Sequence, residues 1–129
     1  MQLDCNILLV DDQAPMRRLV DQYLKVIGFK NVEFAVNGSD ALAKVKAKQP
    51  NGYDIIFVDW DMPEMTGIEF VKSCRKLLSE PPEFIMLTGR REKQDIMVAR
   101  ETDIKWYIAK PVSKNTLVER LNAVFKSKE

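Results

Sequence analysis

The stretch Ile55-Ile56-Phe57-Val58-Asp59-Trp60-Asp61 combines a short apolar run with two carboxylates close behind it. A run of this length is typical of a strand that is buried on both faces of a parallel sheet. Similar runs recur along the chain, with helix-period segments between them. The predicted strands are Cys5 to Val10, Val32 to Val36, Asp54 to Val58, Phe84 to Leu87 and Trp106 to Ile108. This alternation predicts an α/β fold with a five-stranded parallel sheet, doubly wound and flavodoxin-like, and five helices.

The segments between the strands show the apolar spacing of amphipathic helices. The first ends at Gly28, the second follows the turn Asn37-Gly38-Ser39, the third begins at Gly67 and the last follows Pro111. In the segment from Glu92 to Glu101 the apolar side chains, Ile96, Val98 and Ala99 among them, stand among many charges. We therefore expect a weakly amphipathic fourth helix there, which packs loosely and moves.

Composition narrows the classes of function. With 129 residues the chain fits one domain, residues 1–129, and 20 Lys and Arg against 19 Asp and Glu leave no basic excess for nucleic acid. No apolar run approaches the roughly 20 residues of a membrane span, so we expect a cytoplasmic monomer without membrane insertion. Histidine is absent, which excludes Ser/His/Asp and Cys/His nucleophilic sites. Cys5 and Cys74 are interpreted as buried thiols.

Four carboxylates follow two of the predicted strands. Asp11 and Asp12 come after the first strand, and Asp59 and Asp61 come at the end of the third. Parallel strands end at one edge of the sheet, so these side chains are expected to meet. Like charges about 4 Å apart repel by roughly 1 to 4 kcal/mol, which implies a bound cation. Oxygen ligands favour Mg²⁺ or Mn²⁺. The alternative is that each Asp only caps a turn or a helix.

A hydroxyl and an ammonium follow the last two strands. Thr88 stands beside Gly89, which leaves space for an incoming group, and Lys110 precedes Pro111, where a cis peptide bond fits a sharp turn. Mg²⁺, a lysine charge, a hydroxyl and a carboxylate together form a site that binds a phosphoryl group.

These residues belong to motifs that resemble the receiver domain of two-component response regulators. The motifs are Val10-Asp11-Asp12, Val58-Asp59-Trp60-Asp61-Met62-Pro63-Glu64-Met65-Thr66-Gly67, Leu87-Thr88-Gly89 and Tyr107-Ile108-Ala109-Lys110-Pro111. They occur in the family's order and at its intervals, and the match covers essentially the whole chain. Trp60 and Tyr107 are further similarities to the chemotaxis members of that family.

The resemblance implies that Asp59 accepts a phosphoryl group from a histidine kinase. It also implies that the Asp12 and Asp59 side chains and the Asp61 carbonyl hold Mg²⁺. Asp11 would act through metal-bound water. In the same family, the residue two past the acceptor and the residue two past the threonine flank the path of the hydrolytic water. Asp61 and Arg90 are therefore expected to tune dephosphorylation.

The resemblance also implies a switch, which is formed by Thr88 and Tyr107. Lys110 and Thr88 would bind the phosphoryl oxygens, and Tyr107 would swing inward as Thr88 moves. The face made by helix four, strand five and helix five would then bind an output protein, with the flagellar motor switch as one candidate. The chain would be a signalling domain and no enzyme beyond its own phosphotransfer and autodephosphorylation.

Two alternatives stay open. The first is a receiver domain excised from a longer regulator, with which the lack of a basic recognition helix is equally compatible; we expect a free-standing protein. The second is a haloacid-dehalogenase-like phosphatase, which Asp59-Trp60-Asp61 also resembles. That family has its Asp-x-Asp on the first strand and normally a cap domain, for which this chain leaves no room.

Overall fold

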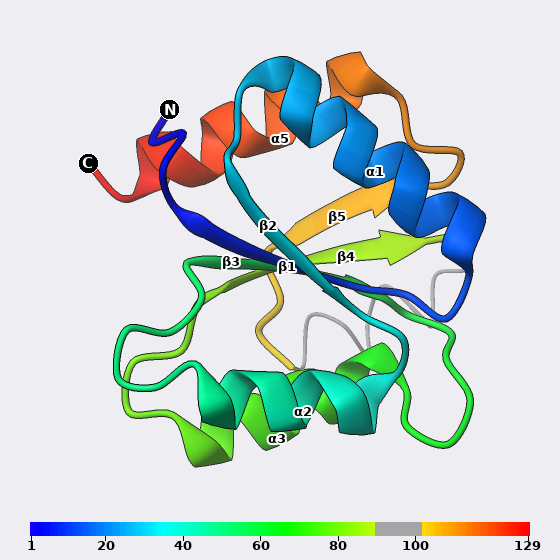
Figure 1. Ribbon diagram of the computed structural model, residues 1–129, viewed down its shortest axis with the longest axis vertical. Helices are drawn as coiled ribbons and strands as arrows, with labels where there is room; N and C mark the ends of the chain where they lie inside the picture. Colours follow the sequence, from blue (N-terminus) through cyan, green and yellow to red (C-terminus); the bar gives the residue numbers. More distant parts are fainter. Residues whose placement is uncertain (90–101) are drawn as a thin grey trace.

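Five parallel strands form the centre of the structure, in the order β2-β1-β3-β4-β5 (Figure 1). The computed structural model describes residues 1–89 and 102–129. The strands are β1 (Asn6–Val10), β2 (Asn31–Ala35), β3 (Ile55–Asp59), β4 (Glu83–Thr88) and β5 (Trp106–Ala109). Every neighbouring pair is parallel, which confirms the predicted α/β, flavodoxin-like fold.

Helices cover both faces of this sheet. Within the described ranges they are α1 (Ala14–Ile27), α2 (Gly38–Ala47), α3 (Gly67–Leu77) and α5 (Lys114–Ser127). In Figure 1, α1 and α5 lie on one face and α2 and α3 on the other. The expected fourth helix, from Glu92 to Glu101, lies outside the described residues, and so does Arg90. No helix in the described part of the chain is long and apolar enough to cross a membrane.

Local sequence signals set the ends of these helices. Pro15 stands in the first turn of α1, where its missing N–H costs no hydrogen bond. Asn37 caps α2 by accepting a hydrogen bond from the Asp40 N–H at 2.8 Å. At the other end of α1, Gly28 takes φ 123°, a conformation that disfavours any residue with a side chain.

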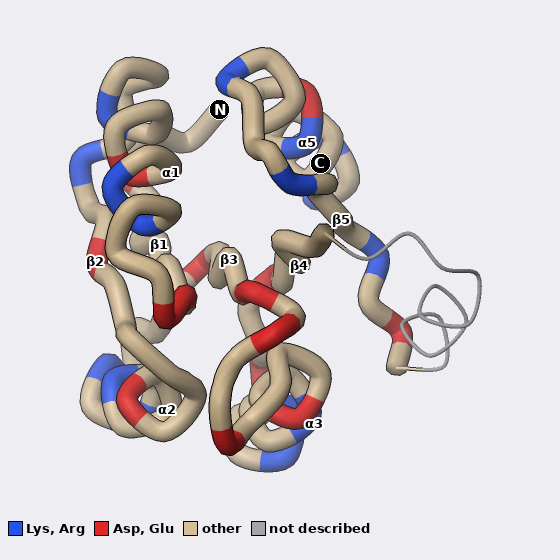
Figure 2. Tube along the Cα trace, turned by 90° about the vertical axis from the view of Figure 1, so that its right-hand side faces the viewer, with Lys and Arg blue, Asp and Glu red and all other residues tan. Residues whose placement is uncertain are grey.

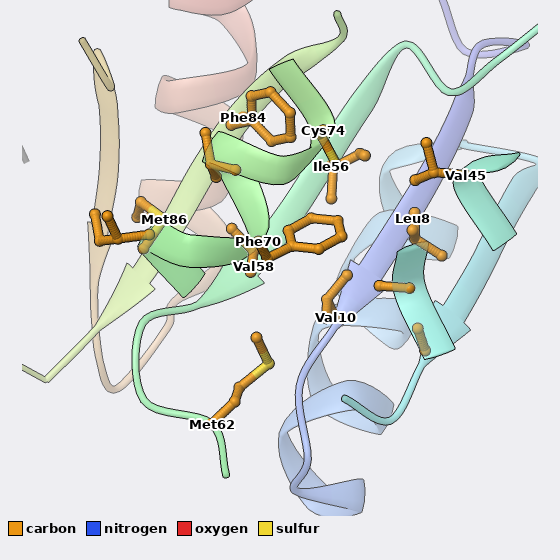
Figure 3. Close-up of a cluster of buried hydrophobic side chains, with 14 of the residues drawn as sticks. Leu8, Val10, Val45, Ile56, Val58, Met62, Phe70, Cys74, Phe84 and Met86 are labelled. Carbon is orange, nitrogen blue, oxygen red and sulfur yellow. The ribbon is translucent and has the colours of Figure 1, made fainter. Parts of the chain in front are cut away.

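The sheet divides the core into two apolar clusters because successive strand residues point to opposite faces. One cluster joins the strands to α2 and α3, and the other joins them to α1 and α5. Figure 3 shows the first cluster, in which Phe70 reaches from α3 toward Ile56 and Val58 of β3. All five residues of β3 are buried. The central strand is therefore fixed from both faces, and so is the position of Asp59 at its end.

Candidate functional site

The strand ends that carry the polar residues are aligned by backbone hydrogen bonds beyond the strands. The Trp60 N–H donates to the Leu87 carbonyl at 3.0 Å, and the Lys110 N–H donates to the Thr88 carbonyl at 2.9 Å. Figure 2 views the molecule from the side toward which the β4 and β5 arrows point in Figure 1, and the acidic segments after β1 and β3 lie near its centre. The carboxyl edge of the sheet is thus a fixed platform for these side chains.

Three of the four predicted carboxylates meet at this edge. Oxygen atoms of Asp11, Asp12 and Asp59 lie within 4.8 Å of one another. Asp11 and Asp59 are only 2% and 4% exposed, whereas Asp12 is exposed to solvent. Two buried carboxylates this close are costly unless positive charge stands among them.

Lys110 supplies part of that positive charge. Its Nζ lies 3.1 Å from Asp59 Oδ1 and 3.6 Å from Asp11 Oδ2. The Lys110–Pro111 peptide bond is cis, as the sequence suggested. Three carboxylates and one ammonium leave two negative charges, which a divalent cation would neutralise. Because all the side-chain ligands are oxygen atoms, the group fits Mg²⁺ or Mn²⁺ rather than a softer metal.

The two carboxylate oxygens of Asp11 are paired to different degrees. Its Oδ2 is buried and accepts no hydrogen bond from the described residues. Its Oδ1 accepts one from the Gln13 N–H at 2.9 Å. The Lys110 ammonium at 3.6 Å gives this oxygen an ion-pair partner but no hydrogen bond, so the oxygen can still bind a cation or accept from water, which supports the same ligand set.

The electrostatics of Asp59 differ from those of an ordinary surface carboxyl. Burial raises the pKa of Asp59 to about 6, the charge of Asp11 adds to this rise, and Lys110 opposes it. The Asp61 N–H donates to Asp59 Oδ1 at 3.3 Å. Asp59 is thus a buried carboxylate that is held beside both a like charge and an opposite one.

Thr88 and Tyr107, the expected switch pair, lie on neighbouring strands. Thr88 is 7% exposed and pairs with Ala109, while Tyr107 pairs with Met86. Met86 and Tyr107 belong to the cluster under α2 and α3, and Thr88 is two residues along the same strand as Met86. The two side chains are therefore diagonal neighbours on one face of the sheet. The Tyr107 hydroxyl donates to the Ile104 carbonyl at 2.7 Å.

The remaining predicted site residues, Asp61 and Arg90, are not among the side chains that the structure brings together at this edge. Asp61 is exposed, and its side chain is not part of the carboxylate group formed by Asp11, Asp12 and Asp59. Its partner in the expected water path, Arg90, is outside the described residues. Gly89 borders open space, since a Cβ there would meet nothing within 4 Å.

Sequence reasoning missed two supports of the site. Arg17 of α1 donates to the Asp11 carbonyl at 2.7 Å and so holds the loop that carries the acidic pair. Gly67 lies so close to the end of β3 that a Cβ would come within 2.4 Å of the Asp59 carbonyl oxygen. The Arg17 contact has no local sequence signal. The Gly67 contact was visible only as a helix start, where Thr66 and Glu69 form a capping box.

The comparisons with known proteins agree with this geometry. Over residues 7–122 the chain matches the response regulator receiver domain. The chain belongs to the response regulator receiver family. It is 35% identical to chemotaxis protein CheY-3 of Vibrio cholerae, over 93% of this chain and 91% of that protein.

Solved structures of receivers are also similar to it. CheY4 of Vibrio cholerae superposes with a TM-score of 0.81 at 31% identity, over 94% of this chain and 98% of that one. A chain from the CheX-CheY-BeF₃-Mg complex of Borrelia burgdorferi superposes with a TM-score of 0.84 at 27% identity, over 94% of this chain and 89% of that one. The predicted identity is confirmed: the chain is a receiver-type signalling domain of phosphorylation-activated two-component signalling.

Proposed function

We propose that Asp59 is the phosphoryl acceptor of this receiver and that a histidine kinase is the donor. One Asp59 oxygen attacks the phosphorus atom of a phosphohistidine, the phosphorus–nitrogen bond breaks, and the electron pair returns to the imidazole nitrogen, which takes up a proton. The observation that carries this assignment is the position of Asp59, which is buried at the end of β3, 3.1 Å from the Lys110 ammonium.

Other residues of the chain position the reacting group. Lys110 is already close to Asp59 and would stay with the phosphoryl oxygens, where its charge counters theirs. Thr88, buried at the end of β4, would donate its hydroxyl to another of these oxygens. Gly89 leaves the space beside Thr88 open. In-line transfer needs little else from a protein than such positioned charges.

The carboxylates of Asp11, Asp12 and Asp59 would hold Mg²⁺, with Asp61 contributing its backbone carbonyl. The donorless Oδ2 of Asp11 and the two excess negative charges of the cluster support this ligand set. The bound ion supplies positive charge that neutralises the phosphoryl oxygens during transfer. The Asp61 side chain and Arg90 would influence the entry of water and hence the lifetime of the phosphorylated state.

The output is a change of partner binding rather than turnover of a substrate. Phosphorylation adds about −1.5 to −2 charge at neutral pH, which draws the Thr88 hydroxyl toward the phosphoryl oxygens. Tyr107 would then move into the vacated space and alter the face that includes β5 and α5. We infer a cytoplasmic output protein for that face, with chemotaxis as the pathway class and a motor component as one candidate.

Acetyl phosphate with Mg²⁺ tests the acceptor directly. We expect an acid-stable, base-labile adduct on Asp59 and none in Asp59→Asn, because the amide cannot attack the phosphorus atom. Asp21→Asn on α1, which removes one carboxylate away from the site, should be labelled like wild type. Wild-type labelling of Asp59→Asn would overturn the assignment. Steady release of phosphate from a free phosphomonoester such as p-nitrophenyl phosphate would instead favour a phosphatase.

A further inference from the structure

Arg75, in the last turn of α3, joins that helix to the residues that lead into β5. Its guanidinium donates hydrogen bonds to the carbonyl oxygen of Thr102 and, at 2.9 Å, to that of Asp103. The guanidinium also lies 5.8 Å from the ring centre of Phe84 in β4. Arg75 therefore contacts two other segments of the chain: strand β4 and the residues that lead into β5.

The next carbonyl in the same turn accepts the switch hydroxyl. Tyr107 donates to Ile104 at 2.7 Å, so the carbonyls of three successive residues are bound by two side chains. Asp103 has φ 56°, a left-handed conformation that turns its carbonyl toward Arg75. The Ile104 side chain is buried in the cluster under α2 and α3.

We propose that Arg75 is a positioning residue for the switch: it holds the Thr102–Ile104 turn as a fixed acceptor for the Tyr107 hydroxyl. This proposal rests on the proposed function, because it concerns the regulation of that phosphoryl site. Arg75 touches neither the carboxylates nor Lys110 in the contacts described above. It acts through the turn and through Tyr107.

The physical reason is that a fixed acceptor favours one position of a mobile donor. With the turn held, the Tyr107 ring keeps its hydrogen bond only where it now lies, and an inward movement breaks that bond. When the turn is released, the bond becomes weaker and the inward position becomes relatively more populated. A ligand that favours the inward position then binds more tightly, because binding and conformational change are thermodynamically linked.

The first test reads the tyrosine directly, without any ligand. Arg75→Met keeps an apolar stem over Phe84 but removes the donors, and Lys76→Met removes the same charge from an exposed neighbour on α3. In tyrosine-labelled protein, with Tyr107 assigned from its loss in Tyr107→Phe, we expect the ring resonances to move only in Arg75→Met. Unchanged resonances in Arg75→Met, or equal movement in Lys76→Met, would overturn the proposal.

The second test uses beryllofluoride with Mg²⁺ as the probe. Arg75→Met should bind beryllofluoride about three to ten times more tightly than wild type, which is the effect of one ordinary hydrogen bond. In the Tyr107→Phe background the same substitution should change the affinity less than about 1.5-fold, because the hydroxyl that Arg75 serves is gone. A merely structural arginine would change both backgrounds equally, and that result would overturn the proposal.

Two controls separate the remaining explanations. Arg75→Lys keeps the charge but lacks the planar pair of donors, so its affinity should fall between those of wild type and Arg75→Met. It also serves if Arg75→Met does not fold. Failure of wild type to bind beryllofluoride would count against the proposed function, whereas the ligand-free resonances would still decide the role of Arg75.

Discussion

Strand β3 has an aspartate near each end, and the two carboxylates are in opposite situations. Asp54, just before the strand, accepts a hydrogen bond from the Asn6 N–H at 2.7 Å. Its own N–H donates to the Asn6 carbonyl at 2.8 Å, and its carbonyl accepts from the Glu83 N–H at 3.1 Å. At this end of the sheet the carboxylate completes the hydrogen bonding of the backbone.

At the other end of the strand, the carboxylate of Asp59 lies beside a like charge. Asp59 is buried next to the like charge of Asp11, whose Oδ2 accepts no hydrogen bond from the described residues. The same residue type on the same strand can therefore have different roles. A carboxylate that completes the hydrogen bonding of the backbone stabilises the fold, whereas carboxylates held close to like charge leave negative charge that can bind a cation.

The largest expected effect tests the rigidity beneath Asp59. In Gly67→Ala the new Cβ would lie 2.4 Å from the Asp59 carbonyl oxygen and 3.1 Å from Trp60 Cα, both backbone atoms. We expect a loss of about 3 kcal/mol in the free energy of unfolding, together with reduced labelling of Asp59, because the backbone of Asp59 must shift. Urea unfolding and acetyl phosphate labelling measure the two effects. Gly89→Ala, which meets open space, is the matched control, and equal stability of both variants would contradict the prediction.

The second prediction concerns the cost of placing Asp59 where it is. Burial raises its pKa from 3.8 to about 6, so the folded state binds more protons and its stability falls as the pH rises from about 4 to 6. The full rise corresponds to about 3 kcal/mol, and Asn removes the charge but also weakens the Lys110 contact. In EDTA at pH 7 we therefore expect Asp59→Asn to be more stable than wild type by about 2 kcal/mol.

Added Mg²⁺ should make wild type the more stable of the two proteins. On the proposed ligand set the carboxylates would bind the ion only in the folded state, so added Mg²⁺ should raise the midpoint of wild-type unfolding. Asp59→Asn lacks one ligand and should respond much less. Identical responses of the two proteins to Mg²⁺ in thermal unfolding would show that Asp59 is not a ligand.

The sequence was sufficient to predict the strands and which polar side chains meet at their carboxyl ends. The apolar run up to Val58 predicts a buried strand, and alignment of parallel strands then brings Asp59 and Lys110 together, as observed at 3.1 Å. Their meeting follows from topology alone. Observed boundaries differ by only a residue or two, as at Asp59, which is itself the last residue of β3.

Contacts that depend on tertiary packing left no signal in the sequence. Arg17 and Arg75 are ordinary basic residues of amphipathic helices, yet each donates to backbone carbonyls of another segment. Nothing local distinguishes them from solvated arginines. Asp54 was likewise predicted only as a strand residue, because its partner Asn6 is 48 positions away. Such roles depend on which segments pack together, which periodicity does not specify.

The third prediction tests the satisfied end of β3. Asp54→Ala leaves the Asn6 N–H without its acceptor at 2.7 Å, and we expect the free energy of unfolding to fall by about 1.5 kcal/mol. Labelling of Asp59 by acetyl phosphate should stay at the wild-type level. The two aspartates then have opposite signatures, since Asp59→Asn gains stability and loses labelling. Loss of labelling in a stable Asp54→Ala protein would contradict the purely structural role predicted for Asp54.

The smallest effect concerns Cys74, whose thiol is buried in the cluster under α3. Burial in the cluster under α3 raises the pKa of Cys74 from 9.0 to about 12. A group whose pKa is higher in the folded state stabilises that state fully below its unfolded pKa, and the contribution is lost as the pH rises above about 9. Unlike Asp59, this thiol stays neutral at physiological pH, so its burial costs nothing there. Between pH 8 and pH 10 the unfolded thiol ionises while the folded one does not, which destabilises the fold by about 1 kcal/mol.

Cys74→Ala loses stability at every pH because it leaves a cavity, but its free energy of unfolding should fall less steeply over this interval. The difference between the two slopes in urea unfolding isolates the thiol from other groups that titrate there, such as Tyr53. Parallel slopes for wild type and Cys74→Ala would show that the thiol ionises as readily inside the fold as outside it.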